Sequence, residues 1–179
     1  MKQLYTIEDV EQAAKRLSHA IHSAYASETE LFFVGILNGG VEFMFRLLHY
    51  VRKRGLSYSY GFMAIDSYKG ADHRVAPPRI TYCSLPRLDN HVAIIIDDIV
   101  DGGNTMILAK NHVELFCPKK IETVSLLYKP GAVYTPDRFG LMVDRDCFVV
   151  GTGMGIGEKH RDKPGIWICD DASIKEIVQ

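Results

Sequence analysis

Apolar residues near the start of the chain recur at the spacing of a helix with one buried face. The apolar positions between residues 6 and 25 are Ile7, Val10, Ala13, Ala14, Leu17 and Ile21. Thr6 and Asp9 resemble a capping box, in which each side chain accepts a hydrogen bond from the other residue's backbone amide. The pattern therefore predicts a helix over residues 6–25. Two further helices are predicted over residues 41–52, after a turn, and 106–116, just before a proline.

Short apolar runs alternate with these helices and predict strands. They lie at residues 31–37, 58–65, 92–96, 122–128 and 147–150. The run VAIII at 92–96 is rich in β-branched residues, which is typical of a parallel strand buried on both faces. Strands that alternate with helices predict an α/β fold with a central, mostly parallel, twisted sheet flanked by helices. Residues 66–78 are polar, contain glycine and proline, and predict a long loop.

Length, composition and charge narrow the class of protein. A chain of 179 residues, 47% hydrophobic and 24% charged, suits a single domain over residues 1–179 with a full hydrophobic core. The formal net charge of −1 gives no global basic field, so nucleic acid is not expected as a partner. No apolar run approaches the ~20 residues that a membrane helix needs, so no membrane partner is expected either.

Cysteine usage and the first residues predict a cytoplasmic protein. The four cysteines are far apart and form no C-x-x-C pair: Cys83, Cys117, Cys147 and Cys169. This spacing argues against a zinc site built on cysteines, and free thiols are expected in the reducing cytosol. The first residues carry acids and lack the apolar segment of a signal peptide.

Two loops stand where a parallel α/β sheet places its ligands, which is at the carboxyl ends of the strands. The first is Asn38-Gly39-Gly40, and the second covers residues 97–105. In the second loop, two adjacent carboxylates end the strand, and a tight glycine-bearing turn then opens a helix. We expect the chemistry of the protein at these two loops.

The second loop combines groups that suit a phosphorylated sugar. Glycines let backbone amides approach a phosphate, the helix N-terminus adds a favourable dipole, and Thr105 adds a hydroxyl donor. Asp97 and Asp98 would repel a phosphate unless they face something else, and ribose hydroxyls and Mg²⁺ are the natural partners. Any one aspartate alone would be interpreted as a cap at a strand–turn–helix junction. The whole run instead favours ribose 5-phosphate with a diphosphate on C1, and it is neither a Walker A loop nor a G-x-G-x-x-G fingerprint.

The run IIIDDIVDGGNT resembles the signature of type I phosphoribosyltransferases. The ribose- and phosphate-binding residues that this implies are Asp97, Asp98, Asp101, Gly102, Gly103, Asn104 and Thr105. The resemblance further implies Mg²⁺ as cofactor, held by Asp97 and Asp98, and phosphoribosyl diphosphate and a purine base as ligands. It also implies the family fold, with a small hood formed by terminal segments, and a homodimer or homotetramer.

The chain from about residue 31 to residue 168 resembles the hypoxanthine-guanine branch of this family. The run SLLYKP looks like the strand whose lysine, here Lys129, donates to the purine O6, and a group that only donates disfavours adenine. The run DCFVVG resembles the segment in which Phe148 stacks on the base and the backbone of Val149 reads its edge. Taken alone, Lys129 would be a solvated residue at a strand end, and the other two would be core residues.

Three more segments match the branch. Asn38 and Gly39 stand in the short loop that binds diphosphate, where the resemblance implies a non-proline cis peptide bond. Arg161 matches the arginine that contacts diphosphate, and a guanidinium fork suits that anion. Ser67 and Tyr68 resemble the Ser-Tyr pair of a mobile loop that closes over the site.

Three positions depart from the pattern. Asn38 replaces the Lys or Arg of many relatives, and Gly102 replaces a Thr or Ser, so a cation and a hydroxyl are missing. Gly155 replaces an aspartate that helps to hold a second Mg²⁺ and lies near the exocyclic group of the purine. Glu158 or Asp162 could substitute for that carboxylate. We therefore expect weaker use of guanine than of hypoxanthine.

The resemblance implies that hypoxanthine or guanine and phosphoribosyl diphosphate give the nucleotide and diphosphate. Asp101 is the candidate general base for N7 of the purine, Lys129 orients O6, and the Tyr68 loop excludes water. Two alternatives stay open at this stage. One is another base, such as xanthine, and the other is a regulatory module that binds phosphoribosyl nucleotides without turnover.

Overall fold

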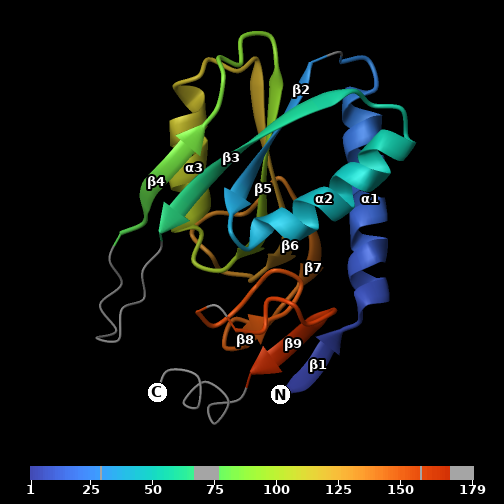
Figure 1. Ribbon diagram of the computed structural model, residues 1–179, viewed down its shortest axis with the longest axis vertical. Coiled ribbons are helices and arrows are strands. Elements are labelled where there is room, and N and C mark those ends of the chain that lie inside the picture. The colour runs from blue at the N-terminus through green and yellow to red at the C-terminus, as the bar shows by residue number, and fades with distance from the viewer. Residues whose placement is uncertain (29, 67–76, 158, 170–179) are drawn as a thin grey trace.

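A six-stranded sheet forms the centre of the molecule (Figure 1). The computed structural model describes residues 1–28, 30–66, 77–157 and 159–169. The strand order is β4-β3-β2-β5-β6-β7. The bounds are β2 (Leu31–Leu37), β3 (Tyr58–Asp66), β4 (Arg79–Ser84), β5 (Val92–Val100), β6 (Lys120–Tyr128) and β7 (Arg138–Met142). Edge strand β4 runs antiparallel to β3 and the other pairs are parallel, which confirms the predicted sheet type.

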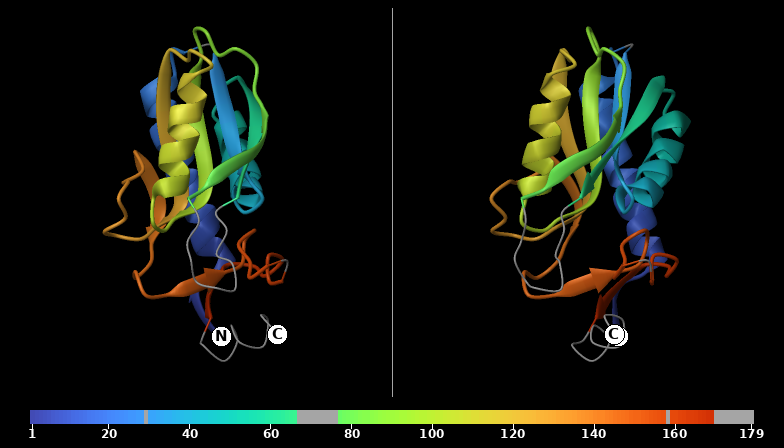
Figure 2. Two further views of the ribbon diagram at one scale, coloured as in Figure 1. Left: turned by 90° about the vertical axis from the view of Figure 1, so that its left-hand side faces the viewer. Right: turned by 60° about the vertical axis from the view of Figure 1, so that its left-hand side comes forward.

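Helices cover both faces of this sheet. Helices α1 (Ile7–Tyr25) and α2 (Gly40–Lys53) lie on one face and α3 (Asn104–Glu114) lies on the other, as Figure 2 shows. The capping box predicted at the start of α1 is confirmed. The amide of Asp9 donates to the Thr6 hydroxyl over 3.2 Å, and the Thr6 amide donates to the Asp9 carboxylate over 2.8 Å.

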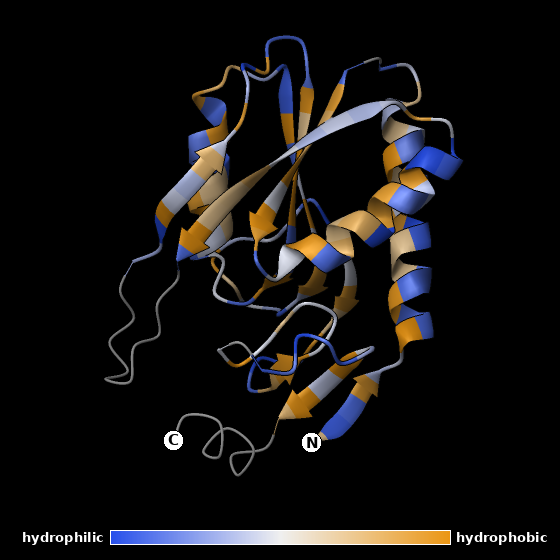
Figure 3. Ribbon diagram, in the orientation of Figure 1, coloured by the Kyte–Doolittle hydropathy of each residue, from blue (hydrophilic) through white to orange (hydrophobic). Residues whose placement is uncertain are grey.

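The sheet separates two hydrophobic cores, and β5 alternates between them. Ile94 and Ile96 face the core under α1 and α2, whereas Ala93 and Ile95 face the core under α3. All four side chains are fully buried. Figure 3 shows the apolar colouring concentrated on the inner strands and on the sheet-facing sides of the helices. The prediction of a strand buried on both faces is therefore confirmed.

A second, antiparallel sheet forms the hood that the resemblance implies. Its strand order is β1-β9-β8, with β1 (Lys2–Tyr5), β8 (Phe148–Val150) and β9 (Ile166–Cys169). The strands come from the two ends of the described chain, so terminal segments do build the hood. In Figures 1 and 2 the hood lies beyond the carboxyl ends of the parallel strands, where it faces the predicted ligand loops.

The sequence pattern misses four strands and ends β5 four residues too early. Strands β1, β4 and β7 are short and mix polar with apolar residues, and β9 is an apolar run of only four residues, IWIC. The prediction of a turn from Asp97 onward is wrong for residues 97–100. Strand β5 keeps pairing with β6 as far as Val100 opposite Tyr128, because both strands extend equally far. Most of the predicted loop at 66–78 falls on residues 67–76, outside the described residues.

The four cysteines, all within the described ranges, form no disulfide bond. Within the described ranges, none of the helices has the length and apolar character needed to cross a lipid bilayer.

Candidate active site

A cleft of about 800 Å³ opens at the carboxyl ends of the central strands. Its lining comes from the ends of β2, β3 and β5, from the start of α3 and from the hood. The residues that line it are Ile36, Leu37, Asn38, Gly39, Ile65, Asp66, Pro78, Asp97, Asp98, Ile99, Val100, Asp101, Gly102, Gly103, Asn104, Thr105, Met106, Gly157 and Arg161. The cleft thus brings together the two predicted loops and the predicted diphosphate arginine, although they lie far apart in the sequence.

Asp97 and Asp98 lie side by side in the last part of β5. Asp97 is buried and accepts a 3.0 Å hydrogen bond from the amide of Asp98, whose own carboxylate accepts from the amide of Ile99 over 2.8 Å. Burial raises the pKa of Asp97 well above its usual value, and the neighbouring charge of Asp98 adds to the rise. Burial also raises the pKa of Asp98, although its hydrogen bonds and the charge of Arg161 oppose the rise. A cation or hydroxyl donors in the cleft would therefore stabilise the charged pair.

The loop after β2 packs directly against this acidic pair. A Cβ atom at Gly39 would overlap Oδ2 of Asp98, so a residue with a side chain does not fit there. A Cβ atom at Gly40 would lie 3.1 Å from the carbonyl oxygen of Ile96. The peptide bond between Leu37 and Asn38 is cis, which confirms the implied non-proline cis peptide in this loop.

The turn between β5 and α3 leaves an open space at one glycine and none at the next. Gly103 has φ of +96°, and a Cβ there would lie 2.7 Å from the amide nitrogen of Tyr134, so this position requires glycine. Nothing lies within 4 Å of a Cβ placed on Gly102. Gly103 is also the N-cap of α3 and makes no side-chain cap, so the helix start presents amides rather than a capping side chain to the cleft.

Lys129 and Asp101 form an ion pair. Nζ of Lys129 donates to Oδ2 of Asp101 over 3.0 Å, and the lysine side chain is 7% exposed against 47% for the aspartate. The lysine reaches the turn from the end of β6, and its backbone amide donates to the carbonyl of Val100. The alternative interpretation of Lys129 as a solvated residue at a strand end is therefore wrong. The two residues expected to serve the purine's O6 and N7 stand next to each other.

The hood contributes the remaining predicted residues. Phe148 is half-buried on β8, and Val149 belongs to the core beneath α1 and α2, as the alternative core interpretation expected. The guanidinium of Arg161 donates to the carbonyls of Gly153 and Gly157, each over 2.8 Å. A Cβ on Gly155 would lie 2.7 Å from Cγ of Arg161 and 2.6 Å from the carbonyl oxygen of Lys159.

Several sequence expectations fall elsewhere. Ser67, Tyr68 and Glu158 lie outside the described residues. Asp162 is exposed and does not line the cleft. Across the described ranges, no group of three or more His, Cys, Asp or Glu side chains is arranged to hold a metal ion. Asp97 and Asp98 could hold a metal ion whose remaining positions are filled by water or by substrate oxygens.

Sequence reasoning misses two contributors to the site. Asp66 lines the cleft from the end of β3, and the rule that ligands gather at the carboxyl ends of parallel strands could have found it. Tyr134 presses against Gly103 from the segment after β6. No local signal marks that tyrosine, because the contact depends on how two distant turns pack.

The family model described as phosphoribosyl transferase domain matches residues 1–156. The chain is 31% identical over 169 residues to a hypoxanthine-guanine phosphoribosyltransferase of Staphylococcus aureus, covering 91% of this chain and 90% of that one. It is 28% identical over 174 residues to the protein of that name from Aquifex aeolicus, covering 96% of each.

Two solved structures show the same fold. The Trypanosoma cruzi hypoxanthine phosphoribosyltransferase, in complex with the product IMP, superposes with a TM-score of 0.86 at 20% identity, covering 96% of this chain and 95% of that one. A hypoxanthine phosphoribosyltransferase from Staphylococcus aureus superposes with a TM-score of 0.84 at 26% identity, covering 96% and 92%.

Proposed function

Because this chain belongs to the phosphoribosyltransferase family and lies within its hypoxanthine-guanine branch, we propose that it is a purine-salvage enzyme. It transfers the 5-phosphoribosyl group of phosphoribosyl diphosphate to hypoxanthine or guanine, and it releases IMP or GMP together with diphosphate. The observation that carries the proposal is one continuous surface. The buried Asp97 and the half-buried Asp98, the open turn at Gly102 and the Lys129–Asp101 ion pair adjoin one another at the end of β5.

The acidic loop supplies the sugar and phosphate contacts of this proposal. The 5′-phosphate binds the backbone amides of residues 102–105 at the start of α3, where the helix dipole favours an anion. Asp97 and Asp98 accept hydrogen bonds from the ribose hydroxyls. The same two carboxylates fit one Mg²⁺ together with substrate oxygens, since a cation would stabilise the charged forms that burial disfavours. Mg²⁺ bound there would neutralise charge on the departing diphosphate.

The Lys129–Asp101 pair supplies the purine contacts. A purine whose O6 accepts from Lys129 would place its N7 near Asp101, because the two side chains are 3.0 Å apart. Asp101 then takes the N7 proton as the new bond to C1 forms. Phe148 offers a face for the base to stack on, and the backbone of Val149 hydrogen-bonds the ring edge. Their position on the hood supports this assignment, because the hood faces the carboxyl end of the sheet.

Diphosphate leaves between the loop after β2 and the hood. Asn38 and Gly39 offer backbone and amide groups on one side, and Arg161 offers a guanidinium on the other. Arg161 now donates to two hood carbonyls, so diphosphate binding replaces part of that hydrogen bonding with a charge-assisted contact. We also propose that a lid that includes Ser67 and Tyr68 closes over the site and excludes water.

Two wider properties complete the proposal. The enzyme acts in the cytoplasm, which suits its four free thiols. It acts as a homodimer or homotetramer, and analytical ultracentrifugation of the purified protein would decide between these forms and a monomer.

Base preference tests the proposed function directly. Rates with hypoxanthine, guanine, xanthine and adenine would be measured at saturating phosphoribosyl diphosphate and Mg²⁺. Hypoxanthine should be the preferred base and adenine should be poor, because Lys129 can only donate to position 6. Turnover of adenine at a rate comparable with hypoxanthine would contradict the role of Lys129, and preference for xanthine would contradict the base assignment.

Guanine should be used less well than hypoxanthine. Glycine at position 155 offers no acceptor side chain for the exocyclic amine, and one missing hydrogen bond of this kind is worth about 0.5–1.5 kcal/mol, or roughly a few-fold to tenfold in kcat/KM. Competition between the two bases in one reaction measures the ratio of kcat/KM. Equal values would mean that backbone carbonyls alone read the amine.

A further inference from the structure

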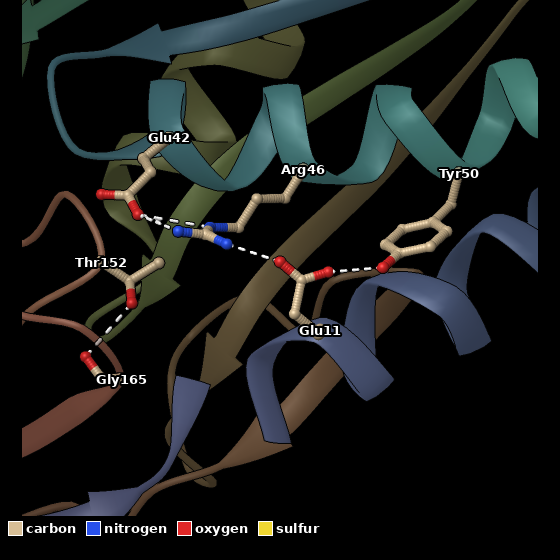
Figure 4. Close-up of polar contacts among 6 residues, drawn as sticks. All are labelled: Glu11, Glu42, Arg46, Tyr50, Thr152 and Gly165. Atoms are coloured by element: carbon tan, nitrogen blue, oxygen red, sulfur yellow. Dashed lines mark hydrogen bonds and ion pairs between the residues drawn. The ribbon is translucent and has the colours of Figure 1, made fainter. Parts of the chain in front are cut away.

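A polar bridge joins α1 to α2 outside the cleft. Arg46 of α2 donates to Glu11 of α1 over 2.5 Å and to Glu42, one turn earlier on its own helix, over 2.7 and 3.2 Å. The Tyr50 hydroxyl donates to the second oxygen of Glu11 over 2.6 Å. Figure 4 shows these four side chains in a row between the two helices. Neither the sequence motifs nor the proposed mechanism gives this cluster a task.

The bridge is half-buried and saturated with hydrogen bonds. Arg46 and Glu11 keep only 28% and 30% of their side-chain surface exposed. Burial alone would raise the pKa of Glu11, but the hydrogen bonds from Tyr50 and Arg46 hold that pKa below its usual value. Glu11 is therefore ionised at neutral pH, and the guanidinium lies between two carboxylates. Removing the guanidinium would leave two like charges close together.

The first turn of α2, which carries Glu42, is wedged between the acidic pair and the hood. Gly39, at its N-cap, is in close contact with Asp98, and a Cβ on Gly40 would lie 3.2 Å from Cα of Asp97. On the other side, a Cβ on Gly153 would overlap the carbonyl oxygen of Gly39 and would lie 3.4 Å from Cβ of Glu42. The position of this turn therefore sets the distance from Gly39 to Asp98 on one side and to Gly153 on the other.

The hood side of that wedge is itself fixed. The Thr152 hydroxyl, beside Gly153, is buried and donates to the carbonyl of Gly165 over 3.1 Å, as Figure 4 shows. Gly165 directly precedes β9, whose neighbour β1 leads through Thr6 into α1. Glu11 lies in the second turn of α1. A closed circuit thus runs from the hood through α1, across the bridge to α2, and back to the hood at Gly153.

We propose that Arg46 is a positioning residue for the diphosphate loop: by holding Glu42 and Glu11 together, it keeps Asn38 and Gly39 at the separation from Asp98 and Gly153 that diphosphate requires. Arg46 does not line the cleft, so it acts through the first turn of α2 and touches no substrate. The inference rests on the proposed function. It adds residues that do not touch the substrate but support the diphosphate loop. The 5′-phosphate loop leads from β5 into α3, which lies on the opposite face of the sheet from α1, α2 and this bridge.

Calorimetry would measure the affinity of the full chain for Mg²⁺-diphosphate and for IMP. The first ligand tests the diphosphate loop, and the second tests the 5′-phosphate loop. Arg46→Gln should weaken diphosphate binding roughly three- to tenfold, a typical size for an indirect coupling, and should leave IMP binding unchanged. KM for phosphoribosyl diphosphate should rise while KM for hypoxanthine stays constant. Arg46→Lys, which can still bridge one carboxylate, should recover part of the loss. Glu11→Gln keeps the Arg46–Glu42 pair, so it should give a smaller loss and guards against an unfolded Arg46 variant.

Lys119→Gln is the matched control. Lys119 forms an ion pair with Glu28, with contacts of 2.8 and 2.9 Å, and it does not line the cleft. The control should bind both ligands like the wild type. Unchanged diphosphate affinity in the Arg46 variants, or an equal loss for diphosphate and IMP, would overturn the inference while leaving the proposed function intact. A wild-type protein that bound neither ligand would overturn the proposed function and this inference with it.

Discussion

Gly102 in the acidic loop and Gly155 in the hood both stand where relatives are expected to carry a polar side chain, yet their surroundings are opposite. Around Gly102, nothing lies within 4 Å of a Cβ atom. Around Gly155, a Cβ would lie 2.6 Å from the carbonyl oxygen of Lys159 and 2.7 Å from Arg161. The first position has room for a side chain. At the second, the arginine and the backbone fill the space.

This difference in surroundings determines how the glycines at positions 102 and 155 affect function. A hydroxyl at position 102 can be restored without moving any neighbour, so its loss affects only one contact to the phosphate. A carboxylate at position 155 would have to displace Arg161, which now donates to the carbonyls of Gly153 and Gly157. The hood loop of this chain is therefore packed around a glycine, whereas the acidic loop has room for a side chain at position 102. The catalytic groups should lie in the acidic loop.

The largest expected effect lies in the acidic loop, at Asp101. Asp101→Asn keeps the shape and still accepts the hydrogen bond from Lys129, but it cannot take a proton. We predict that kcat for nucleotide synthesis falls by about 10²–10⁴, the usual contribution of general acid–base catalysis. The binding of phosphoribosyl diphosphate should change much less. Steady-state kinetics with a separate equilibrium binding measurement would test both parts.

Asp98→Asn provides the contrast within the same loop. Its carboxylate lies against Gly39 and next to Asp97. Because its proposed task is to bind the sugar and the metal, its loss should weaken their binding more than it lowers kcat. Near-normal kcat in Asp101→Asn would leave Asp101 as a support of the phosphate loop, with the proton lost directly to solvent.

An intermediate effect is expected from adding the same methyl group at the two glycines. Gly155→Ala forces a Cβ into occupied space and should reduce the free energy of unfolding by about 1–3 kcal/mol, as overpacking commonly does. Gly102→Ala should leave stability unchanged or raise it by a few tenths to about 1 kcal/mol through the unfolded state. Urea denaturation of both variants measures the difference. Equal stability of the two variants would abolish the distinction between the sites.

The smallest effect should come from restoring the missing hydroxyl. Gly102→Thr adds one hydrogen-bond donor to the 5′-phosphate, worth about 0.5–1.5 kcal/mol, so KM for phosphoribosyl diphosphate should fall a few-fold. Gly102→Val has nearly the same shape and no hydroxyl, and it should not share the gain. If both variants behaved alike, the hydroxyl would have no part in phosphate binding here.

The acidic loop could be predicted from the sequence because its signals are local. Its parts are contiguous in the sequence: the apolar run before Asp97, the paired acids and the glycine turn. The strand places the acids and the turn at the carboxyl end of the sheet, where ligands bind. The cis peptide before Asn38 followed from the family resemblance and was confirmed. The predicted end of β5 is four residues too early, because pairing between β5 and β6 continues to Val100.

The hood could not be predicted in its details, because it is made by contacts across the length of the chain. Lys2 of β1 pairs with Ile168 of β9. Strand β1 has no apolar run, and that of β9, IWIC, has only four residues. The filling of position 155 by Arg161 depends on how the hood loop folds back on itself. The Lys129–Asp101 ion pair likewise depends on the adjacent packing of β5 and β6, although each residue was predicted separately.

A crystal structure of the protein with bound IMP is the most direct test that the acidic loop and Lys129 form one site for a phosphoribosyl nucleotide. The account predicts that the 5′-phosphate lies on the amides of residues 102–105, the ribose hydroxyls on Asp97 and Asp98, and the purine O6 within hydrogen-bonding distance of Lys129. A phosphate bound elsewhere, with those amides covered by protein and the Lys129–Asp101 pair unchanged, would contradict it.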